Sequence, residues 1–241
     1  MKIIEKLKKK KTQRTNADSV TVVCLGDSVT EGCFECFVNA EGGIGTVFDR
    51  NKSYAERLKE LLARLYPSVQ VNVINSGVSG ASARDGLKTL SRDVLRFSPD
   101  LVIVSYGLND SCGGLEKLNE YGDTLGEIFK QVTESGAEAI LLTENAMCTS
   151  VSPHLPEGIC REVAQNFAEM QKAGVIEAYF EKAKEVAARF GVAVCDLYSV
   201  WKAMIDSGVN VTEILSNKLN HPVREYHYYI AVKIFETMMS C

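Results

Sequence analysis

Five short apolar runs, rich in β-branched residues, recur along the chain at residues 20–25, 69–75, 100–107, 138–143 and 192–197. Runs of this kind are typical of strands that are buried on both faces of a sheet. Between them, apolar residues recur at helical intervals, at residues 53–66, 82–97, 115–135 and 176–191. This alternation of strands and helices predicts an α/β fold in which helices cover both sides of a parallel sheet.

Local signals support several helix boundaries. Ser53 followed by Glu56 is a capping-box pattern, and Ser82 begins a similar one. Residues 222–239 have apolar positions at helical intervals, so we expect a closing helix that packs on the sheet. Pro222 suits the first position of that helix, because its ring fixes a helical φ and its missing N–H is not needed there.

The bulk composition suits one α/β domain, since the chain has 241 residues of which 46% are hydrophobic. We expect a flexible basic leader over residues 1–18, where Lys8 to Lys11 precede Arg14, and a single domain over residues 19–241. The formal net charge of −4 provides no electropositive field. A nucleic acid is therefore not an expected partner.

The leader does not resemble a secretion signal. No apolar segment follows its lysines, and no run of about eighteen apolar residues occurs in the chain. Ile3, Ile4 and Leu7 share one helix face, but three apolar residues bury too little surface to hold a membrane. We expect a cytoplasmic protein without stable membrane insertion, and the oligomeric state is left open.

The cysteines predict free thiols, because their spacing is irregular and no secretion signal accompanies them. They are Cys24, Cys33, Cys36, Cys112, Cys148, Cys160, Cys195 and Cys241. Cys33 and Cys36 form a single CxxC pattern without the second pair or the nearby histidine that a zinc site needs. We expect no metal and no cofactor, and the role of this pair is left open.

Candidate chemistry lies where the strands end, because ligands of open α/β sheets bind beyond the carboxyl ends of the strands. The segments at these positions are Gly26-Asp27-Ser28, residues 75–80, Gly107-Leu108-Asn109-Asp110, Thr143-Glu144-Asn145, and the loop 216–222 before the last helix. Ser28 presents a hydroxyl at a sharp turn. A serine hydroxyl is a weak nucleophile and needs a positioned base, usually a histidine.

The chain has three histidines. His221 lies in the loop that returns to the same sheet edge, which makes it the candidate base. His154 follows the fourth strand and is the reserve candidate, whereas His227 lies inside the closing helix, where a packing or capping role is favoured. Taken singly, each is more often structural than catalytic.

An acyl-transfer site also needs donors for the developing oxyanion. Three candidates lie at adjacent strand ends: the backbone N–H groups of Ser28 and Gly80 and the side-chain amide of Asn109. Each has an ordinary explanation as turn or cap chemistry, including the neighbouring Asp110. Their joint occurrence favours a site.

Four segments at these strand ends resemble the four blocks of SGNH (GDSL-type) hydrolases. They are GDSVTEG, the glycine of NSGVSGAS, GLND and NHP, in the family's order, and the similarity extends from residue 20 to about residue 235. The resemblance implies a flavodoxin-like three-layer α/β/α fold with a five-stranded parallel sheet in the order 2-1-3-4-5. It also implies hydrolysis of esters, thioesters or acetylated sugars without a metal. It assigns Ser28 as nucleophile and first oxyanion donor, Gly80 and Asn109 as the other donors, and His221 as base.

The chain departs from the family at one position. An aspartate usually stands three residues before the histidine and orients the imidazole, but Lys218 is found here. A backbone carbonyl or the amide oxygen of Asn217 could accept the Nδ1 proton and give a Ser-His dyad, which we favour. Alternatively, another carboxylate restores a triad, or the chain has lost efficient turnover. The nearest carboxylates in sequence are Asp206, Glu213 and Glu225. A large gain in turnover for Asn217→Asp would indicate a weakened dyad, and no gain would count against it.

Two connections are long for this fold, at residues 29–52 and 145–170. Loops of this length are usually binding elements or lids. We expect the first, which contains Phe34, Phe37 and Phe48, to shape the acyl or leaving-group pocket. The alternative is that its aromatic residues only seal the edge of the sheet. We expect the second connection to form the opposite wall and to hold a short helix.

The sequence therefore predicts a serine esterase that cleaves small esters, with O-acetyl groups on carbohydrates as one candidate substrate. Thioesterase or lysophospholipase activity is an alternative. A catalytically weak or inactive binding protein on the same scaffold is a rival, since fold does not fix function. A nucleotide or flavin binder is disfavoured, because the first loop lacks both phosphate-binding glycine patterns.

Overall fold

The computed structural model, which describes residues 1–240, has a central sheet of five parallel strands. The strands are β1 (Val20–Gly26), β4 (Val71–Gly77), β5 (Leu101–Ser105), β6 (Glu138–Thr143) and β7 (Ala193–Asp196). Their order in the sheet is β4-β1-β5-β6-β7. Counted along the sheet strands alone, this is the order 2-1-3-4-5, so the predicted α/β fold class is confirmed.

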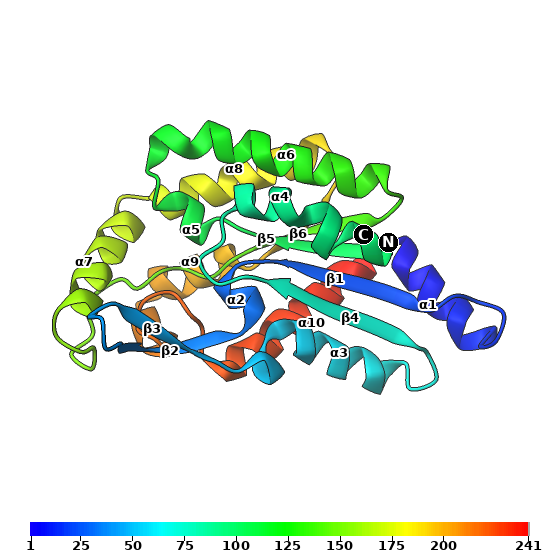
Figure 1. Ribbon diagram of the computed structural model, residues 1–241, viewed down its shortest axis with the longest axis horizontal. Helices are drawn as coiled ribbons and strands as arrows, with labels where there is room; N and C mark the ends of the chain where they lie inside the picture. The colour runs from blue at the N-terminus through cyan, green and yellow to red at the C-terminus, as the bar shows by residue number, and fades with distance from the viewer. Residues whose placement is uncertain (241) are drawn as a thin grey trace.

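Helices cover both faces of the sheet (Figure 1). One face carries α4 (Ala83–Asp93), α6 (Leu118–Glu134) and α8 (Val175–Arg189), and the other carries α3 (Tyr54–Leu65) and α10 (Arg224–Ser240). Strand side chains alternate between the faces. In β1, Val22 and Cys24 belong to the core beneath α3 and α10, whereas Val23 and Leu25 belong to the core beneath α4 and α6.

The carboxyl ends of three neighbouring strands are level. Gly26 pairs with Gly77 of β4 on one side and with Ser105 of β5 on the other. Two four-residue helices start just beyond, α2 (Ser28–Glu31) and α5 (Leu108–Ser111). A Cβ on Gly77 would lie 2.3 Å from the backbone nitrogen of Glu31, so this close approach of β4 to α2 requires glycine.

The first long connection forms a hairpin, which the sequence pattern did not predict. Its strands β2 (Cys33–Val38) and β3 (Ile44–Phe48) pair antiparallel in a separate two-stranded sheet. The second connection contains α7 (Ile159–Lys172), which is longer than the short helix expected there, and α9 (Tyr198–Asp206) follows β7. Single 3₁₀ turns occur at Arg50–Lys52, Leu95–Phe97, Leu115–Lys117 and Val211–Ile214.

The basic leader differs from the flexible segment expected over residues 1–18. Its residues Lys2–Thr12 form helix α1, in which Ile3 and Leu7 are buried in the core. The Glu138 carboxylate accepts the backbone N–H groups of Lys2 and Ile3, both at 2.8 Å. The apolar residues that share one face of this helix therefore cover the protein's own core. Within the described part of the chain, no helix is both long and apolar enough to cross a membrane.

Two smaller features complete the comparison with the sequence. Helix α10 begins at Arg224, because Pro222 is paired with Leu215 in an isolated antiparallel bridge instead of starting the helix. The seven cysteines within residues 1–240 are free thiols. Cys241 lies outside the described residues.

Candidate active site

Ser28 is the first residue of α2 and is only 4% exposed. The preceding residue, Asp27, caps the helix, since its carboxylate accepts the N–H of Val29 at 2.9 Å. At the first position of a helix, the N–H has no intrahelical acceptor. The turn therefore presents the Ser28 hydroxyl beside a backbone N–H that no residue of the helix accepts.

The His221 imidazole contacts this hydroxyl. Its Nε2 lies 3.0 Å from Ser28 Oγ, and its Nδ1 lies 3.0 Å from the carbonyl oxygen of Phe34 in β2. A carbonyl can only accept a hydrogen bond, so Nδ1 carries the proton and Nε2 is left as the acceptor. This is the tautomer that a general base needs to take the proton of a serine.

Burial keeps the imidazole neutral. It lowers the pKa of His221 from 6.5 to about 4, and the hydrogen bond to Phe34 offsets only part of this effect. The ring is therefore an available base at neutral pH. A carbonyl would stabilise a protonated imidazole less than a carboxylate does, because it carries only a partial charge.

Asn217, expected as a residue that orients the imidazole, has a different place. Its Oδ1 accepts the backbone N–H groups of Leu219, Asn220 and His221 at 2.9 to 3.0 Å. The side chain thus fixes the loop that carries the histidine, and the favoured carbonyl acceptor is that of Phe34. An Asn217→Asp variant would for this reason not place a carboxylate on Nδ1.

Lys218, at the usual aspartate position, has a φ of 57° and turns away from the ring. Its amine donates to the Glu213 carbonyl at 2.8 Å and forms an ion pair with the carboxylate of the same residue at 3.0 Å. Within residues 1–240, no carboxylate is hydrogen-bonded to the imidazole, whose two nitrogens are occupied by Ser28 and Phe34. This includes the alternatives considered from the sequence, Asp206, Glu213 and Glu225.

Gly80 has a φ of 78°, a conformation that favours glycine. A Cβ at this position would meet no atom within 4 Å, so glycine is needed for the backbone conformation and not for space. Its N–H forms no hydrogen bond with any residue of the described chain. The loop is fixed by Glu31, whose carboxylate accepts the N–H of Ser79 at 2.6 Å.

Asn109 reaches the same edge from α5, but its donors are engaged. Its Nδ2 donates to Asp27 Oδ2 at 3.1 Å and to the carbonyl of Ala81 at 2.9 Å. An amide nitrogen has two protons, so Asn109 must release one partner to serve an oxyanion. The adjacent Asp110 accepts the N–H of Ala83, at the start of α4, which matches the cap role considered for it.

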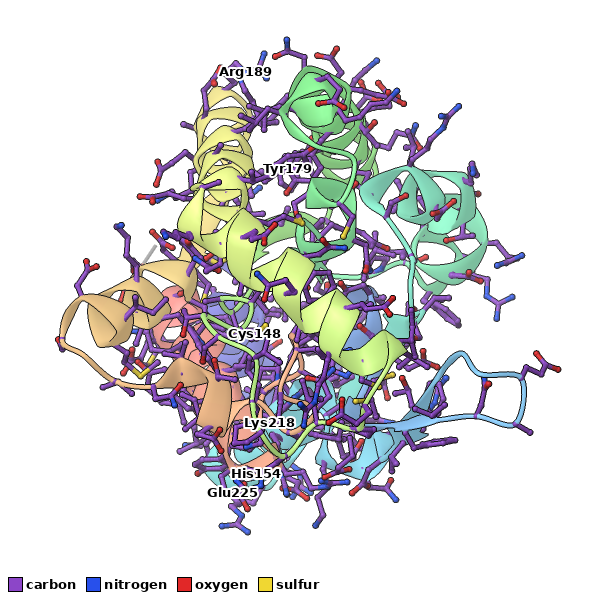
Figure 2. The ribbon with its side chains drawn as sticks, turned by 90° about the vertical axis from the view of Figure 1, so that its left-hand side faces the viewer. Cys148, His154, Tyr179, Arg189, Lys218 and Glu225 are labelled. Carbon is purple, nitrogen blue, oxygen red and sulfur yellow. The ribbon has the colours of Figure 1, made fainter. Side chains whose placement is uncertain are left out.

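The other two histidines do not contact Ser28. His227 is buried and its Nδ1 accepts the backbone N–H of Tyr54 at 3.0 Å, which confirms the capping interpretation. His154 is exposed on the loop before α7. Figure 2, which looks toward the carboxyl ends of the strands, shows His154 near Lys218, and both lie close enough to Glu213 to lower its pKa.

Sequence reasoning did not assign three residues of the site the roles that the structure gives them. Phe34 acts through its carbonyl, which no side-chain pattern reveals. Glu31 belongs to the GDSVTEG segment and could have been singled out as an acidic residue close to Ser28. Glu144 directly follows β6, where its carboxylate accepts the N–H of Leu108 at 3.0 Å.

Within residues 1–240, no group of three or more histidine, cysteine or acidic side chains is arranged to hold a metal ion.

Comparison with known proteins places this geometry in a family. A model of the GDSL-like lipase/acylhydrolase family matches residues 24–227. An acetylxylan esterase of Geobacillus stearothermophilus is 33% identical over 86 residues, which are 36% of this chain and 37% of that protein. The matched segment therefore covers little more than a third of the length of this relative.

Solved structures share the fold over nearly the whole chain. A variant of an acetyl-xylooligosaccharide esterase from Geobacillus is 20% identical, with a TM-score of 0.66 over 91% of this chain and 94% of that one. LAE5, described as an alpha/beta hydrolase from the metagenome of Lake Arreo, is 21% identical, with a TM-score of 0.66 over 92% and 97%. Since the family model covers most of the sequence, the chain belongs to the GDSL-like lipase/acylhydrolase family.

Proposed function

We propose that this protein is a serine esterase that removes small acyl groups, with acetyl groups on carbohydrates as the preferred substrate class. The observation that carries the proposal is the contact of 3.0 Å between Ser28 Oγ and an imidazole whose other nitrogen faces an obligate acceptor. Among relatives, the acetylxylan esterase of G. stearothermophilus has structures of variants described as catalytic mutants, one at a serine and one at a histidine. This agrees with a Ser-His mechanism.

In the proposed reaction, Ser28 Oγ attacks the ester carbonyl while His221 Nε2 takes its proton. The oxyanion receives the N–H groups of Ser28 and Gly80 and one N–H of Asn109, which exchanges the Ala81 carbonyl for the substrate oxygen. His221 then protonates the departing alcohol. In the second half, the same nitrogen activates a water that hydrolyses the acyl-enzyme.

The surroundings favour a hydroxyl-bearing leaving group. A groove of about 270 Å³ opens beside Asn109 between α4 and α6. Polar and charged side chains line it, including Ser82, Arg84, Lys117, Glu120 and Thr124. The polar groups of this lining can hydrogen-bond to sugar hydroxyls.

The test compares p-nitrophenyl esters of increasing acyl length with acetylated xylo-oligosaccharides. We expect acetyl esters to be preferred, and we expect Ser28→Ala and His221→Gln each to lower kcat by at least about 10³-fold. His154→Gln, the matched control at the other loop histidine, should leave kcat unchanged. Preference for long acyl chains or thioesters would support the alternative activities.

A fluorophosphonate probe separates an enzyme from a binding protein. The wild type should be labelled at Ser28, and Ser28→Ala should not. Absence of both turnover and labelling would contradict the proposal and support a binding role for the same scaffold.

A further inference from the structure

Two buried carboxyl groups lie beneath the nucleophile. Asp27 and Glu144 follow β1 and β6, and each is only 1% exposed. Asp27 accepts N–H groups from Val29 and from the Asn109 side chain, and Glu144 Oε2 accepts the N–H of Leu108. The carboxyl groups of Asp27 and Glu144 lie close enough for each to affect the pKa of the other.

One oxygen of this pair lacks a donor. Glu144 Oε1 is buried and receives no N–H or O–H from any residue of the described chain. Buried polar atoms are almost always satisfied, and two ionised carboxylates side by side would repel each other strongly. A single proton on the pair resolves both difficulties, because it turns one of two facing acceptors into a donor.

The surroundings place this proton on Glu144. Burial and the neighbouring charge of Asp27 raise the pKa of Glu144 well above its usual value. Burial raises the pKa of Asp27 only to about 6, because its interactions with Glu144 and with the backbone of Val29 offset part of the effect. Of the two carboxyl groups, Glu144 is therefore the one that holds a proton more readily.

We propose that Glu144 is a positioning residue that remains protonated and donates a hydrogen bond to Asp27, so that Asp27 holds Asn109 and the turn at Ser28 in place. This role rests on the proposed esterase function for its kinetic readout only. With this hydrogen bond, Glu144 would extend the contacts by which Asp27 holds Asn109 and caps α2. Loss of the Glu144 proton would put two negative charges beneath the nucleophile.

Besides the thiol of Cys33 in β2, the other titratable groups that face the pair are acidic or phenolic. They are Asp110 of α5, Tyr54 of α3, Tyr106 after β5 and Tyr121 of α6. Burial raises the pKa of Asp110 to about 7 and holds the three phenols neutral far above neutral pH. The groups that affect the pKa of Glu144 include no lysine or arginine. Since no such cation within residues 1–240 pairs with Glu144, a proton is the positive charge that can balance the pair.

The first test reads the proton without using activity. Above the pKa values of about 6 and about 7 of Asp27 and Asp110, the infrared spectrum should still show the carbonyl stretch of a neutral carboxyl group. Glu144→Gln should remove this band. Glu138→Gln, at the other end of β6, is the matched control and should retain it. Absence of the band in the wild type would overturn the proposal whether or not the protein is an esterase.

The second test reads the consequence for catalysis. In Glu144→Gln the amide N–H replaces the carboxylic O–H, so we expect kcat at neutral pH within about 3-fold of wild type, whereas Glu144→Met should lose about 10-fold or more. The wild type should lose kcat at alkaline pH as Glu144 ionises, and Glu144→Gln should lack this decline. An unchanged alkaline decline in Glu144→Gln, or equal kcat in the Gln and Met variants, would overturn the positioning role. Circular dichroism of each variant excludes misfolding as the cause.

Discussion

At the scale of single residues, the site differs from a Ser-His-Asp triad in one acceptor. The Phe34 carbonyl takes the place of a carboxylate on His221 Nδ1. Sequence motifs could identify Ser28, Gly80, Asn109 and His221 as candidates, because their side chains or conformations carry the chemistry. A main-chain acceptor leaves no such signal, since any residue at position 34 supplies the same carbonyl.

This acceptor has a consequence for titration. Because burial lowers the pKa of His221 and no carboxylate within residues 1–240 raises it, the ring should titrate near pH 4 and stay neutral from about pH 5 upward. The measurement is an NMR titration of histidine-labelled protein, with His221→Gln used to assign the resonance. A midpoint near 6.5 would contradict the buried, carbonyl-bonded ring.

The same shift affects stability. Since the unfolded histidine titrates near 6.5 and the folded one near 4, lowering the pH through this window protonates only the unfolded state. The neutral ring therefore costs the folded state nothing above about pH 6.5. Lowering the pH from there to about 4 should reduce the free energy of unfolding by on the order of 3 kcal/mol.

At the scale of elements, the hairpin β2–β3 supplies the acceptor and α10 holds the hairpin. Arg224, the first residue of α10, donates to Asp49 at 3.0 Å and to Glu35 at 2.9 Å, and its guanidinium lies 4.2 Å above the Phe34 ring. These contacts lie on and next to Phe34, whose carbonyl faces the imidazole. An element distant in sequence thus helps to fix the carbonyl that faces the His221 imidazole.

Removing the contacts of Arg224 with the hairpin should disturb the position of the His221 imidazole without removing a group that contacts substrate. We expect Arg224→Met to lower kcat by about 10-fold, because a displaced Phe34 carbonyl no longer fixes the tautomer, with a smaller change in KM. Lys233→Met is the matched control, since it removes an exposed ion pair with Glu236 on the same helix. A wild-type kcat in Arg224→Met would show that the hairpin holds its position by other contacts.

The sequence could predict the sheet better than the hairpin. All five strands of the sheet were identified, since continuous apolar runs are a strong signal for strands buried on both faces. The hairpin lacks this signal: Phe37 is 48% exposed and Phe48 is 54% exposed, and Gly45 faces Phe37 across the strands. With neither face fully buried, its polar and apolar residues do not alternate regularly enough to indicate a strand.

At the scale of the whole molecule, the active site and the N-terminal helix lie at opposite ends of the sheet. Figure 1 shows α1 beside the amino ends of the strands, while α2 and the hairpin lie at their carboxyl ends. The run of lysines favoured a solvated leader, but two buried residues one turn apart pack this segment on the core as a helix. Ile3 and Leu7 are 2% and 0% exposed, and burying such side chains contributes about 1.5–3 kcal/mol each.

This arrangement predicts that stability and activity separate. Leu7→Ala should lower the free energy of unfolding by about 2–5 kcal/mol, because it leaves a cavity in the core, while kcat of the folded enzyme stays unchanged. Lys9→Ala, on the exposed side of the same helix, is the matched control and should change stability by less than about 0.5 kcal/mol. Urea unfolding measures both variants. If Leu7→Ala were as stable as Lys9→Ala, the leader would be the solvated segment that its charge pattern first indicated, and the core beneath α10 would be complete without it.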